Sequence, residues 1–250
     1  MIKLFFDIWQ SLERQDEHEK VLKRLVQWAE TLAGEINNRR KVVIQFVIGT
    51  IYGKLANYRD KARRCQQAIR KFGEVLNIYT LDTSPVDYAG IQNNLGTAYG
   101  TLASVRDKET NCQQAIQAYE RALQVRTLEA FPVQYAGTQN NLGNAYWTLA
   151  SVRDKEANCQ KAIAAYQEAL QVRTLDAFPI DYAMTQQNLG VAYWTLAEVR
   201  DKETNCQQAI AAYRKALQIY TRERYPEPYR GIKGNLERLK EFCEKANTSE

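Results

Sequence analysis

The apolar residues of this chain return every three or four positions, the spacing of helices that bury one face. Between residues 132 and 178 this spacing predicts two helices. The first begins at Phe131-Pro132, because proline suits the first turn of a helix, and runs to about Arg153. A charged break follows, with Asn158 as the expected N-cap of a second helix.

The two-helix pattern repeats with a period of 47 residues. The dipeptide Leu-Gly recurs at this interval, at 95–96, 142–143 and 189–190. Segments 132–178 and 179–225 are identical at 31 of 47 positions. The chain is therefore predicted to be an array of helix pairs, and the lone helix after Pro226 is predicted to cap it.

Each unit carries the pattern Gly-x-x-Tyr in its first helix and Ala-x-x-x-Phe/Tyr in its second. In the third unit these residues are Gly143, Tyr146, Ala162 and Tyr166. The pattern resembles the tetratricopeptide signature and recurs in four units from Asn38 onward. The resemblance implies an all-α fold, a right-handed superhelix (α-solenoid) of antiparallel helix pairs. Because the usual unit has about 34 residues, the surplus indicates helices lengthened by about two turns each, similar to those of kinesin light chains and of bacterial signalling proteins.

These landmarks divide the chain into six predicted segments. They are an N-terminal capping helix pair at 1–34, repeats at 35–84, 85–131, 132–178 and 179–225, and a C-terminal capping helix and tail at 226–250. We expect the apolar residues of 1–14 to pack against the first repeat. A homodimer contact through 1–14 is the alternative.

Charge and hydropathy restrict the expected partners. The 34 basic and 29 acidic residues leave a net charge of +5 that is spread along the chain, with acids beside each recurring arginine, so a nucleic acid partner is not expected. The most apolar window, 42–49, is far shorter than the roughly 20 residues of a membrane-spanning helix. No secretory leader pattern begins the chain. We expect a cytoplasmic protein with no membrane partner.

Cysteine and histidine form no recognisable catalytic or metal-binding pattern. Four cysteines share one register of the second helices: Cys65, Cys112, Cys159 and Cys206. Equivalent helices of neighbouring repeats lie about 8–10 Å apart, beyond the roughly 7 Å between Cα atoms that a disulfide allows. Five free thiols are therefore predicted, counting Cys243. His18 is the sole histidine and no Gly-rich phosphate loop is present, so neither enzymatic activity nor a cofactor or metal is expected.

The resemblance also implies where a ligand binds, because first helices line the concave surface of tetratricopeptide proteins. The implied residues are Asn93, Asn94, Asn140, Asn141, Asn144, Trp147, Gln187, Asn188, Trp194 and Asn235. The basic side chains with which some family members clamp chaperone tails are missing from units two to four. The predicted function is a protein–protein interaction scaffold that binds a peptide segment of a partner in a largely uncharged groove. The alternative is a self-associating structural or regulatory module that acts on a separate effector enzyme.

Four of these residues resemble an asparagine ladder at the 47-residue interval: Asn94, Asn141, Asn188 and Asn235. An asparagine amide offers both a donor and an acceptor, so it can bind the N–H and C=O of one residue in an extended peptide. With a rise of about 10 Å per repeat and roughly 3.3–3.6 Å per peptide residue, four asparagines would span about nine peptide residues. In the alternative, each asparagine bonds the neighbouring helix.

Overall fold

The computed structural model describes residues 20–21, 23–27, 30, 38–56 and 60–244. It divides into two compact units, Met1–Asp107 and Lys108–Glu250, and we describe each by itself. The division falls inside the predicted repeat 85–131, between its two helices. Residues 1–14, expected to pack against the first repeat with a homodimer contact as the alternative, lie outside the described residues.

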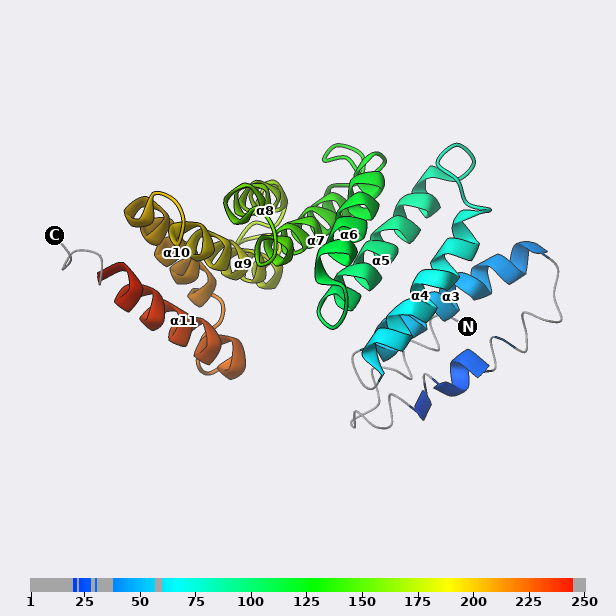
Figure 1. Ribbon diagram of the computed structural model, residues 1–250, viewed down its shortest axis with the longest axis horizontal. Helices are drawn as coiled ribbons and strands as arrows, with labels where there is room; N and C mark the ends of the chain where they lie inside the picture. The colour runs from blue at the N-terminus through cyan, green and yellow to red at the C-terminus, as the bar shows by residue number, and fades with distance from the viewer. Residues whose placement is uncertain (1–19, 22, 28–29, 31–37, 57–59, 245–250) are drawn as a thin grey trace. The chain divides into compact units, whose positions relative to one another are not determined.

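The first unit contains three long helices in its described part. They are α3 (Asn38–Leu55), α4 (Lys61–Leu76) and α5 (Pro85–Ala103). Each packs on the next, α3 on α4 and α4 on α5 (Figure 1). Gly49 on α3 lies against Phe72 on α4, where an added Cβ atom would come within 2.9 Å of the phenyl ring. The glycine of the Gly-x-x-Tyr pattern and the aromatic residue of the Ala-x-x-x-Phe/Tyr pattern therefore lie where α3 and α4 cross closely.

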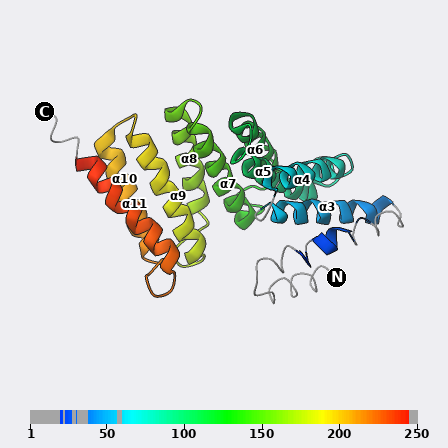
Figure 2. The ribbon, with the colours of Figure 1, turned by 60° about the horizontal axis from the view of Figure 1, so that its bottom comes forward.

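The second unit continues the same alternation of longer and shorter helices. They are α6 (Lys108–Leu123), α7 (Pro132–Ala150), α8 (Lys155–Leu170), α9 (Pro179–Ala197), α10 (Lys202–Leu217) and α11 (Pro226–Glu244). Consecutive helices pack on one another along this unit (Figure 2). The described part of the chain is helical without strands, which confirms the predicted all-α fold and is consistent with an α-solenoid. The connector 171–178 takes up part of the 47-residue period that the sequence assigned to longer helices.

The predicted N-cap was wrong, and the structure shows why. Helix α8 begins at Lys155, after Asp154, whose φ of 41° places it in the left-handed region. Asn158 lies in the first turn instead, and its amide donates to the carbonyl oxygen of Arg153 at 2.8 Å. It thus satisfies a carbonyl just beyond the end of α7, which stops at Ala150 and not near Arg153.

Close glycine–tyrosine packing joins the two helices of each pair in the second unit. A Cβ atom on Gly143 would lie 2.6 Å from the Tyr166 ring, and one on Gly190 would lie 2.8 Å from the Tyr213 ring. Both tyrosines are almost fully buried. Because real Cβ atoms do not approach a ring so closely, only glycine fits at these two positions.

The prediction of five free thiols was also wrong, because Cys206 and Cys243 form a disulfide with a Cα–Cα distance of 6.2 Å. The prediction considered only equivalent helices, whereas this bond joins α10 to the adjacent α11. One repeat earlier, Cys159 packs against Leu196 in one hydrophobic cluster. Cys243 lies 47 residues after Leu196 and occupies the equivalent position on α11. Its sulfur therefore meets the sulfur of Cys206. The 47-residue interval between Leu196 and Cys243 was the sequence feature that could have predicted the disulfide.

We expect alkylation of the unreduced, denatured protein to modify three cysteines, namely Cys65, Cys112 and Cys159. In the native protein these thiols should react slowly near neutral pH. Burial raises the pKa of each to about 11, so little of the reactive thiolate is present. Peptide mass spectrometry identifies the modified residues, and labelling of Cys206 or Cys243 before reduction would contradict the disulfide.

Candidate functional site

The first helices α7, α9 and α11 meet along one surface, which we call the first-helix face. On it the Trp147 indole N–H donates to Thr195 Oγ1 at 3.1 Å, linking α7 to α9. The Arg238 guanidinium carbon lies 6.0 Å from the centre of the Trp194 ring, linking α11 to α9. The face therefore brings together residues that stand one repeat apart in the sequence.

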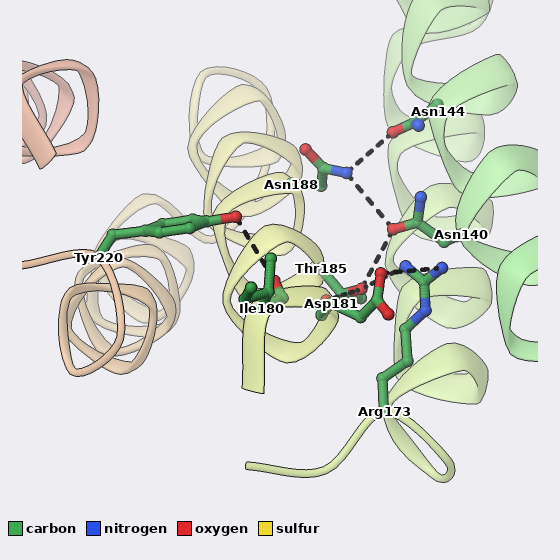
Figure 3. A network of polar contacts seen from close by, with 8 residues as sticks. All are labelled: Asn140, Asn144, Arg173, Ile180, Asp181, Thr185, Asn188 and Tyr220. Atoms are coloured by element: carbon green, nitrogen blue, oxygen red, sulfur yellow. Dashed lines mark hydrogen bonds and ion pairs between the residues drawn. The ribbon is translucent and has the colours of Figure 1, made fainter. Parts of the chain in front are cut away.

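A polar network ties α7 to α9 on this face (Figure 3). The Asn188 amide donates to Asn144 Oδ1 at 3.2 Å and to Asn140 Oδ1 at 3.4 Å. The Tyr166 hydroxyl donates to the same Asn144 oxygen at 2.7 Å. Of the four ladder asparagines, Asn188 thus bonds a neighbouring helix, as the alternative interpretation of the ladder expected.

The other predicted site residues are placed differently. Asn141 is half-buried, and no hydrogen bond joins its side chain to another described residue. In the first unit the Asn93 amide lies 3.4 Å from Asn94 Oδ1, and in the second unit Asn235 Oδ1 accepts from Arg238 at 2.6 Å. Gln187 is half-buried. The four ladder positions are therefore not equivalent, because Asn188 bonds α7 whereas Asn94 and Asn235 accept from a neighbour on their own helix.

The sequence interpretation missed the arginine that continues this network. Arg173, in the connector before α9, donates to Thr185 Oγ1 at 3.1 Å and lies 3.6 Å from an Asp181 carboxylate oxygen (Figure 3). Burial lowers the pKa of Arg173, and Asp181 acts in the opposite direction. The same contact recurs one repeat earlier, where Arg126 donates to Thr138 at 3.0 Å. The arginine and the threonine of this contact both recur at the 47-residue interval, and that recurrence could have predicted the contact from the sequence.

The recurring charged corners are paired between repeats. Arg153 lies 2.8 Å from Glu109, Arg200 pairs with Glu156, and Lys155 lies 3.0 Å from Glu198. These side chains are about half exposed, and exposed pairs contribute little to stability. Their positive charge is locally balanced.

A cavity of about 290 Å³ lies beside the disulfide, away from the predicted site residues. Its lining includes Lys202, Ile210 and Cys243. Within the described ranges, no three His, Cys, Asp or Glu side chains are grouped so that they could hold a metal ion. In the same ranges, no helix combines the length and apolar character needed to cross a membrane.

Removing the hydroxyl of the two buried tyrosines should have opposite outcomes. Tyr166→Phe removes the hydrogen bond to Asn144, so we expect a loss of about 0.5–1.5 kcal/mol of stability. Tyr213 has a buried hydroxyl with no hydrogen bond in the described structure, so Tyr213→Phe should leave stability unchanged or raise it. Urea unfolding of both variants checks this pair, and equal losses would contradict it.

Comparison with known proteins agrees with this geometry. The family model described as tetratricopeptide repeat matches residues 136–175 and 183–221, which cover most of α7–α8 and α9–α10. The structure defines an all-helical repeat protein. Its two matched segments are tetratricopeptide repeats, and the helix pairs around them are consistent with a repeat protein of that type.

No curated protein matches the chain. Among solved structures, one is described as computational design of self-assembling cyclic protein homooligomers. It shares 17% sequence identity over 92% of this chain and 94% of the other, with a TM-score of 0.21. At that score the likeness carries no argument about function.

Proposed function

We propose that this protein is a protein–protein interaction scaffold, and that its first-helix face binds an extended peptide segment of a partner. Trp147 is the observation that carries the proposal. Its side chain is 39% exposed, although large aromatic rings are usually more deeply buried. Its indole N–H is held by Thr195, so the ring has a defined orientation. A rigid exposed aromatic ring gives contact area at low cost in conformational entropy.

The amide of Asn141 supplies the polar part of the same surface. It lies on α7 two turns before Thr148, and its side chain makes no hydrogen bond with another described residue. An amide of this kind can pair with the backbone of a ligand, because it offers one acceptor and two donors. The matched repeats support the proposal further, since stacked repeats present extended binding surfaces.

The test begins with a random nonapeptide library displayed on phage and selected on the full chain. Titration calorimetry should then give one bound peptide per chain. Trp147→Ala should weaken the selected peptide by about fivefold or more, because truncating an anchoring aromatic residue commonly costs over 1 kcal/mol. Val133→Ala, which shortens an exposed apolar side chain at the start of α7, should leave affinity unchanged. Failure to enrich any peptide, or equal effects of both variants, would contradict the proposal.

A further inference from the structure

The disulfide between α10 and α11 takes the place of a contact between cysteine and leucine. In two earlier repeats the buried cysteine of the second helix shares a hydrophobic cluster with a leucine of the next first helix, Cys65 with Leu102 and Cys159 with Leu196. The equivalent residue on α11, 47 positions after Leu196, is Cys243. The last described helix pair therefore has a covalent bond where these earlier pairs have a packing contact.

Helix α11 is held less firmly by packing than the equivalent helix α9. Both helices are 19 residues long, but α11 buries three residues, Ile232, Leu236 and Leu239, whereas α9 buries eight. The difference arises because α9 packs against both α8 and α10, whereas no described helix follows α11. Elements with few buried contacts open locally at a lower free energy than the core. The disulfide thus constrains a helix that packing alone holds weakly.

The two bonded cysteines differ in access to solvent. Cys206 is 3% exposed, whereas Cys243 is only partly buried. The cavity of about 290 Å³ is lined by both cysteines, and it reaches the surface because the exposed residues Glu203 and Gln207 line it as well. One water molecule takes up about 30 Å³ in the liquid. The cavity therefore has room for a small organic thiol beside Cys243.

We propose that Cys243 is a site of reversible modification by a low-molecular-weight thiol, which enters this cavity, opens the disulfide and releases α11 from its covalent link to α10. The incoming thiolate attacks Cys243 Sγ, because Cys206 is buried. The bond between the two cysteines breaks, Cys206 leaves with the electron pair and takes up a proton, and Cys243 carries a mixed disulfide. A second thiol then attacks the sulfur of the bound small molecule. Cys243 is released as a thiol, and two small thiols have become one disulfide.

The mixed disulfide should persist long enough to be isolated, because the released Cys206 is a weak nucleophile. Cys206 occupies the position of Cys159 one repeat earlier, where burial raises the pKa of the thiol to about 11. Little Cys206 thiolate is therefore present near neutral pH to displace the small thiol and form the disulfide again.

Opening the disulfide also affects the first-helix face. Arg238 of α11 lies with its guanidinium carbon 6.0 Å from the centre of the Trp194 ring of α9. Local opening of α11 removes this contact and uncovers the indole ring. The modification thus links the redox state of the last helix pair to the surface formed by the first helices.

Glutathione is the probe for the modification itself. The oxidised full chain is incubated with it at neutral pH, samples are quenched with acid at successive times, and peptide mass spectrometry locates the adduct. We expect one glutathione on Cys243 and none on Cys206. An adduct on Cys206, or no adduct at any time, would overturn the proposal.

Two tryptophan variants test the route through the cavity. Gln207→Trp places a large ring at an exposed position of the cavity lining and should slow adduct formation about tenfold or more. Gln208→Trp is the matched control, because Gln208 is also exposed on α10 but does not line the cavity. Equal rates in the two variants would contradict entry through the cavity.

Hydrogen exchange of the oxidised and the reduced full chain tests the release of α11. Reduction with dithiothreitol should speed the exchange of α11 amides about tenfold or more and leave those of α7 and α8 unchanged, because the disulfide constrains α11 alone among first helices. Cys243→Leu restores the leucine of the earlier repeats, so its exchange should not depend on dithiothreitol. Equal exchange in oxidised and reduced wild type, or the same dependence in Cys243→Leu, would overturn the proposal. Neither measurement requires a bound peptide, so both are independent of the proposed function.

Discussion

Replacing Gly143 with leucine should destabilise the protein by several kcal/mol. The Cβ atom alone would lie 2.6 Å from the Tyr166 ring, so α7 and α8 would have to separate or the ring would have to leave its site. Overpacking a core typically costs about 1–3 kcal/mol. Displacing Tyr166 would add the loss of its hydrogen bond to Asn144. Urea unfolding measures the change.

Gly100→Ala is the matched control, because a Cβ atom there would meet nothing within 4 Å. Alanine favours helix over glycine by about 0.8–1.0 kcal/mol, so this variant should be slightly more stable than wild type. A Gly143→Leu protein that unfolds at the wild-type urea concentration would show that α7 and α8 do not make the close contact described above.

Changing both Asn141 and Asn188 to alanine should weaken a selected nonapeptide about tenfold or more. The Asn141 amide can give two hydrogen bonds to a peptide backbone, whereas the Asn188 amide N–H already donates to α7. Each bond contributes about 0.5–1.5 kcal/mol, and 1.4 kcal/mol corresponds to tenfold in affinity. The structure adds a second expectation. Asn188 donates to Asn140 and Asn144, so the double variant should also melt at a lower temperature.

The single variants separate recognition from stability. Asn141→Ala should lose affinity with an unchanged melting temperature, because the Asn141 side chain makes no hydrogen bond with another described residue. Asn188→Ala should lower the melting temperature. Calorimetry and thermal denaturation of both variants decide the matter, and unchanged affinity of Asn141→Ala would remove the asparagine ladder from the mechanism of binding.

The fold could be predicted from the sequence because the same packing requirement recurs in several repeats. Gly143 and Gly190 each precede a buried tyrosine of the next helix by 23 residues, and one such pair alone would not have been informative. Helix starts at proline were equally predictable, since Pro132 and Pro179 open α7 and α9. Residues that share one structural role could thus be recognised because they recur at a fixed interval in the sequence.

The site was less predictable because side chains of one register make different contacts. Asn188 finds acceptors on α7, whereas Asn235 does not find them on α9, since Val191 replaces the asparagine of the preceding repeat. The disulfide was missed for the same kind of reason. Cys243 replaces a leucine that packs against cysteine elsewhere, and only the contact between α10 and α11 reveals the pairing.

Photo-crosslinking of a selected nonapeptide to the full chain tests the proposed binding face most directly. The peptide carries benzoylphenylalanine at one position at a time, and mass spectrometry locates the attachment sites on the protein. Attachment should fall on α7, α9 and α11, near Trp147, Asn141 and Trp194, and should advance from one first helix to the next as the label moves along the peptide. Attachment to the second helices α8 and α10, or at sites that do not move with the label, would contradict binding across the first-helix face.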